Sequence, residues 1–220
     1  LRISKKYNIE LSSIYLTLNA VPENFFRFSP TKDESKKIIL EKFEIEKYIL
    51  YVSRIEKRKN QDLLIDSFIR KKIFENGYKL VLVGNETLES GFKNKLKEFN
   101  MKANNSIKWL NKIDSNDLMH LYNASEFFVY PSSAEGFGIP PLEAASLDVP
   151  VLCSNLTAME DFNFFIPYTF DPNKQGSLDK GIDLMLNNYT GIQTRLIKEK
   201  IHKKYSWSQT AAVFKEKILN

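Results

Sequence analysis

The sequence contains little cysteine and histidine, and it has no long apolar segment. Cys153 is its one cysteine, and His120 and His202 are its two histidines among 220 residues. A single cysteine excludes an internal disulfide, and two histidines so far apart in the sequence form no metal-ligand motif. No apolar run approaches about 20 residues, so we expect no membrane-spanning helix, and the first residues lack the hydrophobic segment of a signal peptide. These absences predict a reducing, cytoplasmic environment, in which Cys153 is the buried thiol of an apolar strand.

The excess of basic over acidic residues is small. The chain has 32 lysines and arginines against 27 acidic residues, a formal net charge of +5. Binding to nucleic acid or to a membrane does not follow from so small an excess, although a nucleotide-sugar or an anionic membrane surface would benefit from it. The basic runs at 57–59 and 70–72 occur without an RNA- or DNA-binding motif. We therefore interpret each run as a solvated helix edge and expect no nucleic acid partner.

A glycine-containing segment between a strand and a helix is the most informative part of the sequence. The apolar run Phe127–Tyr130 predicts a buried strand, and Gly136 and Gly138 follow it in a loop where φ > 0 is permitted. Two prolines at 140 and 141 predict the first turn of a helix, with Glu143 in that turn. Uncovered N–H groups and the helix dipole make such a loop an anion site, and Glu135 and Glu143 flank it.

Short apolar runs alternate with helical patterns along most of the chain. Strands are expected at 14–18, 48–52, 78–83, 107–110, 127–130, 150–154 and 168–172, and helices at 31–43, 61–69, 89–99, 176–188, 190–202 and 206–218. A further helix is expected after residues 111–115, where Asp114 caps it rather than binding a metal ion, and Asn60 and Ser208 are expected to cap two others. This alternation predicts an α/β fold, a Rossmann-like parallel sheet with helices on both faces.

The loops that follow the strands of such a sheet gather at one edge. Arg54, Gly84, Asn111 and Glu135 each follow a different predicted strand. Ligands of open parallel sheets bind outside the carboxyl ends of the strands. We therefore expect these residues to lie along one binding edge.

Two motifs resemble those of a known enzyme family. Glu135 and Glu143, with Gly-Phe-Gly-Ile-Pro-Pro-Leu between them, resemble the signature of the group 1 family of retaining glycosyltransferases, which have the GT-B fold. The segment 53–60 is similar to the family's Gly-Arg-Leu segment with a lysine five residues after the arginine, although Ser53 and Asn60 stand where glycine is common. Residues 157–161 resemble a third family segment, and Gly84 lacks the second glycine that many relatives carry. The resemblance covers most of residues 19–215 and implies one half of a GT-B fold.

The resemblance implies a role for each matching residue. Glu135, Arg54 and Lys59 would be the catalytic residues, with Arg54 and Lys59 against the donor diphosphate and Glu135 beside the donor sugar. Glu143 would bind the ribose hydroxyls, for which an ionised carboxylate is a suitable acceptor. The remaining donor-binding positions would be Gly84, Asn111, Lys112, Ile113, Gly136, Phe137, Gly138 and Ile139. No metal and no cofactor other than the nucleotide-sugar donor is expected.

The resemblance implies the donor-binding part of a retaining, metal-independent hexosyltransferase. Residues 1–24 would be a remnant of an N-terminal domain with its linker, 25–205 the nucleotide-sugar-binding domain, and 206–220 a terminal crossover helix. The missing N-terminal domain would be a partner, so we expect the isolated chain to be inactive. Among GDP-, UDP- and ADP-sugars the resemblance favours GDP-mannose, with a glycan or lipid-linked acceptor of the lipopolysaccharide type, in the bacterial cytoplasm or at the inner face of the membrane.

Two other functional classes stay open. A nucleotide-binding or regulatory module could use the same glycine loop without transferring a sugar. A nucleic-acid-binding domain would instead require tight and strongly salt-dependent binding to oligonucleotides. An intact acceptor domain in the parent gene would favour the enzyme over the module, and calorimetry against a panel of nucleotides would reduce the uncertainty most.

Overall fold

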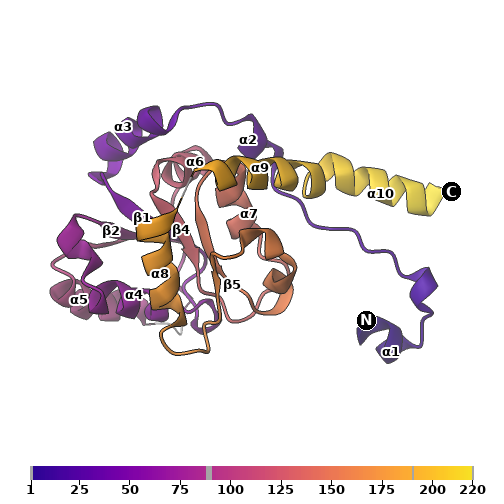
Figure 1. Ribbon diagram of the computed structural model, residues 1–220, viewed down its shortest axis with the longest axis horizontal. Coiled ribbons are helices and arrows are strands. Elements are labelled where there is room, and N and C mark those ends of the chain that lie inside the picture. The colour runs from indigo at the N-terminus through magenta and orange to yellow at the C-terminus, as the bar shows by residue number, and fades with distance from the viewer. Residues whose placement is uncertain (1, 88–90, 190, 220) are drawn as a thin grey trace.

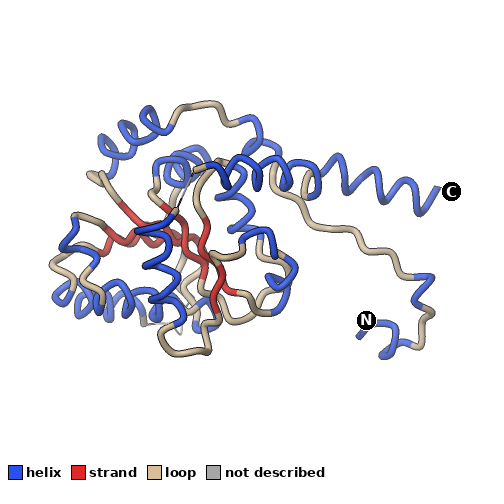
Figure 2. Tube along the Cα trace, viewed as in Figure 1, coloured by secondary structure: helices blue, strands red, loops and turns tan. Residues whose placement is uncertain are grey.

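The chain forms one parallel sheet with helices on both faces (Figures 1 and 2). The computed structural model describes residues 2–87, 91–189 and 191–219. The strands are β1 (Tyr48–Val52), β2 (Lys79–Val83), β3 (Ile107–Leu110), β4 (Phe127–Tyr130), β5 (Val151–Ser154) and β6 (Thr169–Phe170). They are ordered β3-β2-β1-β4-β5-β6, and every pairing between neighbours is parallel. The predicted Rossmann-like α/β fold is confirmed.

The order of the strands determines where a ligand can bind. From β1 the chain moves outward through β2 to β3, then returns to place β4 against the free side of β1. This reversal between β1 and β4 is the point of a doubly wound sheet at which the loops of the two halves diverge and leave a crevice. The loops that follow β1 and β4 are the segments predicted to carry the site.

Two layers of helices cover the two faces of the sheet, because alternate residues of each strand point to opposite sides. Leu50, Val81 and Phe128 point to one face, and Ile49, Leu80 and Phe127 to the other. The first face packs against α2 (Glu23–Arg27), α3 (Lys32–Phe43), α6 (Ser115–Ala124), α7 (Ile139–Ser146) and α9 (Ile192–Lys204). The second packs against α4 (Gln61–Arg70), α5 (Phe92–Lys102) and α8 (Ser177–Asn188). Short 3₁₀ turns lie at Leu11–Ser13, Lys57–Lys59, Ile73–Asn76, Thr157–Asp161 and Asn163–Phe165.

The predicted helix caps have mixed outcomes. Asp114 caps α6 as expected, because its carboxylate accepts hydrogen bonds from the N–H groups of Asn116 and Asp117, both at 2.9 Å. Asn60 occupies the N-cap position of α4 as predicted, but its side chain makes no capping bond: its φ of 53° lies in the left-handed region, and its amide donates to the carbonyl of Pro131 instead. The cap predicted at Ser208 is wrong, since this residue lies inside α10 (Trp207–Leu219). Two predicted helix starts, Glu89 and Thr190, lie outside the described residues.

The strand predicted at 14–18 is wrong. This stretch has no regular structure, and Leu16 is 75% exposed. Alternation of apolar residues makes a strand only where a neighbouring strand supplies hydrogen bonds, and among the described residues no strand pairs with it. It runs beside α10, where Thr210 donates to the carbonyl of Leu18, and both segments extend away from the sheet (Figure 1).

The described helices include none long and apolar enough to cross a membrane. The division of the chain at residues 24 and 205 stays a prediction.

Candidate functional site

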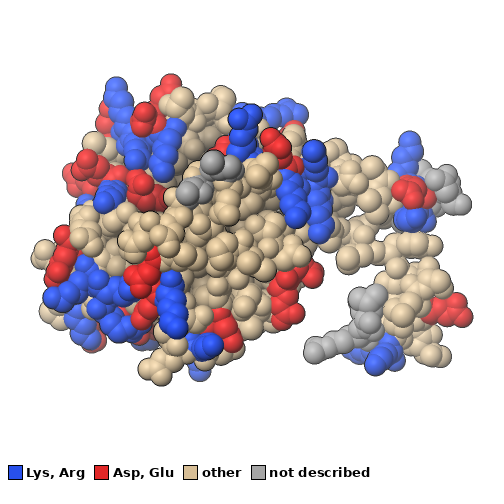
Figure 3. Space-filling model, in the orientation of Figure 1, with Lys and Arg blue, Asp and Glu red and all other residues tan. Residues whose placement is uncertain are grey.

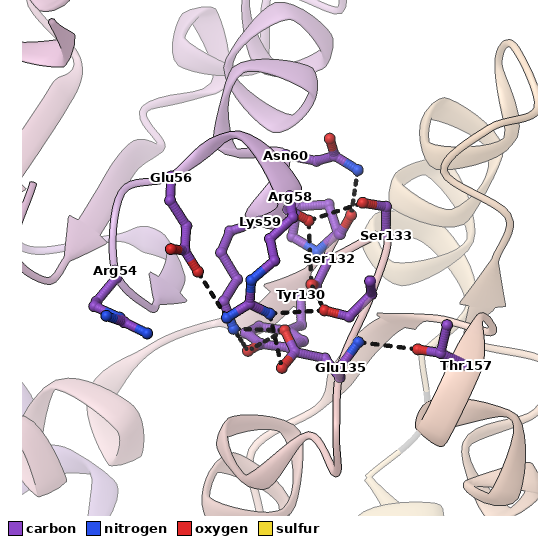
Figure 4. Close-up of polar contacts among 12 residues, drawn as sticks. Arg54, Glu56, Arg58, Lys59, Asn60, Tyr130, Ser132, Ser133, Glu135 and Thr157 are labelled. Atoms are coloured by element: carbon purple, nitrogen blue, oxygen red, sulfur yellow. Dashed lines mark hydrogen bonds and ion pairs between the residues drawn. The ribbon is translucent and has the colours of Figure 1, made fainter. Parts of the chain in front are cut away.

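The loops that follow β1 and β4 are bonded to each other at the carboxyl edge of the sheet. The N–H of Ser133 donates to the carbonyl of Arg58 at 2.9 Å, and the hydroxyl of Ser132 donates to the same carbonyl at 3.2 Å. The amide of Asn60 completes the contact through Pro131, at 3.0 Å. The left-handed turn at Asn60 thus attaches the first loop to the second instead of capping α4 (Figure 4).

Lys59, Tyr130 and Glu135 form a closed polar cluster between these two loops. The ammonium of Lys59 lies 2.5 Å from Glu135 Oε1 and 2.9 Å from the hydroxyl of Tyr130. The same hydroxyl donates to Glu135 Oε1 at 2.9 Å. The side chains of Lys59 and Glu135 are only 8% and 9% exposed, so this is a buried ion pair (Figure 4).

The charges of the cluster follow from its contacts. Burial by itself raises the pKa of Glu135, but the hydrogen bonds from Lys59 and its other partners outweigh burial and hold that pKa below its usual value. Burial and the neighbouring Glu135 raise the pKa of Tyr130 far above its usual value. At neutral pH Glu135 is therefore a carboxylate, and Tyr130 is a neutral hydroxyl that donates to it.

Two arginines of the first loop have different environments. Arg58 donates to the carbonyl of Ala134 at 2.8 Å and also approaches Glu135 at 3.5 Å and Glu56 at 2.7 Å. Arg54 is exposed, and Figure 4 draws it to one side of the cluster with no contact to the other residues shown. Sequence reasoning assigned Arg54 to the site and missed Arg58.

The interpretation of residues 57–59 as a solvated helix edge is wrong at one position. Lys59 is 7% exposed, because the 3₁₀ turn Lys57–Lys59 directs it inward while Lys57 stays exposed. The basic run itself was the available signal for Arg58. Three consecutive side chains in one tight turn point in different directions, so they cannot all lie on one solvated face.

The glycine loop leads directly into α7. Gly138 has a φ of 92°, and a side chain there would approach Met159 to 3.1 Å, so this position requires glycine. Gly136 does not have a positive φ, and added atoms there would meet nothing within 4 Å. Phe137 packs edge-on against Phe162 and Tyr205, and Ile139 begins the helix.

Glu143 lies in the second turn of α7 rather than in the first, because the helix already begins at Ile139. Its carboxylate accepts a hydrogen bond from the hydroxyl of Tyr122 at 3.0 Å. Burial raises the pKa of Glu143, and the bond from Tyr122 offsets this in part. The two glutamates of the motif therefore have opposite electrostatic environments.

The other predicted donor-binding residues lie along the same edge. A side chain at Gly84, whose φ is 138°, would lie 2.0 Å from the carbonyl oxygen of Ser53, so glycine is required where the loops after β1 and β2 meet. Asn111 and Lys112 are exposed and Ile113 is half-buried, all directly after β3. Strand β3 is three positions from β4, about 14 Å at the usual spacing of strands. The cluster and these residues thus lie three strands apart along the same edge.

Sequence reasoning also missed a residue that fixes the glycine loop. The hydroxyl of Thr157, which follows β5, accepts a hydrogen bond from the N–H of Glu135 at 3.0 Å. The resemblance of residues 157–161 to a family segment gave no indication of this contact, and Glu160 in the same segment is exposed. The edge as a whole presents an exposed arginine, a buried lysine–glutamate pair and a helix N-terminus, a combination suited to an anionic ligand that also carries hydroxyl groups.

Comparison with known proteins agrees with this geometry. The sequence pattern of the family described as "Glycosyl transferases group 1" matches residues 32–203. The O-antigen chain mannosyltransferase B of Escherichia coli is 32% identical over 174 residues, which are 78% of this chain and 45% of that protein. A glycosyltransferase from Rickettsia africae superposes with a TM-score of 0.82 at 20% identity, over 100% of this chain and 61% of that one. The Anabaena protein HepE, solved in complex with UDP, superposes with a TM-score of 0.79 at 16% identity, over 96% of this chain and 58% of its own. The chain thus spans less than two thirds of each of these proteins.

Proposed function

Because this chain belongs to the glycosyl transferases group 1 family, we propose that it is the donor-binding half of a retaining, metal-independent hexosyltransferase. The observation that carries the proposal is the lysine–glutamate pair between the loops after β1 and β4. It lies at the reversal of strand order, where doubly wound sheets bind their ligands.

Each part of the edge has a role in this proposal. Arg54 and Lys59 neutralise the negative charge that develops on the diphosphate as it leaves with the bonding electrons, which is the task of a divalent ion in metal-dependent enzymes. Glu143 accepts hydrogen bonds from the ribose hydroxyls. Glu135 and the N–H groups of residues 136–139 orient the sugar and its phosphate. Retention of configuration implies transfer to the same face of the sugar.

The donor and acceptor are proposed from the relatives. Several similar proteins are named as mannosyltransferases of O-antigen or lipopolysaccharide core, which favours mannose, carried by GDP, and a glycan or lipid-linked acceptor. Because a structural neighbour was solved in complex with UDP, UDP is included among the nucleotides to be tested. The acceptor would reach the sugar from an N-terminal domain, at the cytoplasmic face of the membrane.

Calorimetry on this chain tests the proposal. We expect a nucleoside diphosphate to bind more tightly than its nucleoside, with GDP preferred over UDP and ADP, and with no effect of a chelator. Arg54→Ala should remove much of the diphosphate preference. Lys57→Ala removes one exposed positive charge from the same loop and should have little effect. Loss of binding with a chelator, or equal effects of the two substitutions, would contradict the metal-free diphosphate site.

The alternatives predict different results. A nucleotide-binding or regulatory module would bind the nucleotide, but the full-length protein would not transfer a sugar. A nucleic-acid-binding domain is the less favoured alternative, because on the face in Figure 3 basic and acidic side chains are interspersed rather than gathered into a basic patch.

A further inference from the structure

We propose that Tyr130 is a positioning residue of this site: its hydroxyl holds the ammonium of Lys59 and the carboxylate of Glu135 in a fixed arrangement. The proposal rests on the proposed function for its ligand, but its geometry stands independently. Tyr130 lies at the end of β4, directly before the loop that carries Glu135.

The hydroxyl is the shared point of the cluster. It lies 2.9 Å from Lys59 Nζ and 2.9 Å from Glu135 Oε1, and the directions of these bonds are complementary. Lys59 can only donate and an ionised Glu135 can only accept, whereas a tyrosine hydroxyl does both. The tyrosine hydroxyl therefore accepts a hydrogen bond from Lys59 and donates one to Glu135. A side chain without the hydroxyl would remove one hydrogen-bond partner from each of the two charged groups.

Tyr130 is also the most deeply buried member of the cluster. It is 1% exposed, and its ring stacks on Phe128 with a centroid distance of 6.0 Å and an interplanar angle of 20°. Lys59 and Glu135 lie in a short 3₁₀ turn and a loop, which by themselves fix long side chains poorly. A strand residue thus determines where two loop residues place their charges.

This arrangement matters because, in the proposed function, both charges would contact the same ligand. Lys59 is proposed to contact the diphosphate and Glu135 the sugar, and their separation fixes the distance between these two contacts. Without the hydroxyl the ion pair would persist, but its two side chains could rotate together. The diphosphate would then meet a lysine that is no longer held in one position.

The first test needs no ligand. In the described part of the chain, Lys59 is 7% exposed and its ammonium lies 5.4 Å from the centre of the Tyr130 ring. Its ammonium protons should exchange slowly and give an NMR signal that is assigned through contacts to that ring. Tyr130→Phe should abolish or strongly broaden the signal while the backbone spectrum and thermal midpoint show a folded protein.

The matched control is Tyr168→Phe. Tyr168 is also a buried tyrosine, 6% exposed, whose hydroxyl donates to a backbone carbonyl, that of Asn188, away from the cluster. This substitution removes a buried hydroxyl without touching the site, so the Lys59 signal should persist.

The second test uses a nucleoside diphosphate and its nucleoside, here GDP and guanosine. In Tyr130→Phe the ratio of their affinities should fall by about tenfold, the equivalent of one hydrogen bond to a charged group, while guanosine affinity is unchanged. Tyr168→Phe should leave the ratio as in the wild type. If the wild-type chain binds no nucleoside diphosphate of any base, the proposed function is wrong, and the NMR signal still decides whether Tyr130 positions Lys59. An unchanged Lys59 signal in Tyr130→Phe, an unchanged affinity ratio in a chain that binds GDP, or failure of the variant to fold would each overturn the positioning role.

Discussion

Replacing each glutamate of the motif by glutamine should have opposite effects on the free energy of unfolding. Glu135 accepts from Lys59 at 2.5 Å and from Tyr130 at 2.9 Å, and both members of the ion pair are more than nine-tenths buried. Removing one partner of a buried pair costs about 3 kcal/mol or more, because the other charge is left without compensation. Glu135→Gln should therefore lower the free energy of unfolding by about 3 kcal/mol.

Glu143→Gln should change stability little, and in the stabilising direction. Its carboxylate has one hydrogen bond from the described residues, from Tyr122 at 3.0 Å, and a glutamine carbonyl can accept the same bond. Because burial raises the pKa of Glu143, the native state disfavours the charge that glutamine removes. The free energy of unfolding should stay within about 1 kcal/mol of the wild-type value. The variant should nevertheless lose affinity for ribonucleotides, because it lacks the charge that strengthens hydrogen bonds to the ribose.

The pH dependence checks the assigned electrostatics. The pKa of Glu135 is lower in the native than in the unfolded state, so its stabilising effect is present above the unfolded pKa of about 4.3 and is lost as the pH falls through the native pKa. The pKa of Glu143 is raised, so the native wild-type chain takes up this proton first, and the small advantage of Glu143→Gln disappears as the pH falls toward about 4.3. In acid, therefore, the destabilisation by Glu135→Gln and the small stabilisation by Glu143→Gln should both decrease toward zero.

Urea unfolding of the wild type and both variants, followed by far-ultraviolet circular dichroism from pH 7 down to about pH 2, measures these quantities. Equal destabilisation by the two substitutions at pH 7 would refute the reasoning. A Glu135→Gln effect that does not decrease in acid would show that its origin is packing rather than charge.

Three further predictions follow from single positions. Gly84→Ala should lower the free energy of unfolding by about 3 kcal/mol, because its Cβ would lie 2.0 Å from a backbone carbonyl oxygen of the facing loop. Gly136→Ala, with open space around it, is the control and should change the free energy of unfolding by less than about 0.5 kcal/mol. Urea unfolding measures both values. Burial lowers the pKa of His120 in the native state, so stability should fall as the pH drops below the unfolded value of about 6.5, and His120→Gln should flatten this dependence in thermal melts; an unchanged slope would contradict it. Tyr122→Phe should raise the pKa of Glu143 and weaken binding of a ribonucleotide about tenfold, with a smaller loss of affinity at higher pH. Calorimetry with the 2′,3′-dideoxynucleotide should show no change in affinity. Equal losses of affinity for both nucleotides would refute the role of Glu143 in binding the ribose.

The sequence alone determined most of the strands and much of their environment. The runs 48–52 and 127–130 coincide with β1 and β4, because four or five consecutive apolar residues between polar turns favour short strands covered on both faces. The stretch 107–110, which includes Lys108, coincides with β3. Capping at Asp114 was also predictable, since its hydrogen bonds reach only two and three residues ahead. The family followed from the same kind of local information, the spacing of Glu135 and Glu143 around the glycine loop.

Only the tertiary structure decided which side chains meet. The contact between Lys59 and Glu135 joins residues 76 positions apart, and it exists because β4 returns to the free side of β1. No periodicity along the chain specifies that return. Asn60 illustrates the same limit: its sequence context favours a helix cap, but the neighbouring loop offers the carbonyl of Pro131 at 3.0 Å, and the side chain bonds there. Local patterns determine the elements because their hydrogen bonds and burial are satisfied within a few residues, whereas the partners of the buried charges are set by the order in which the strands assemble.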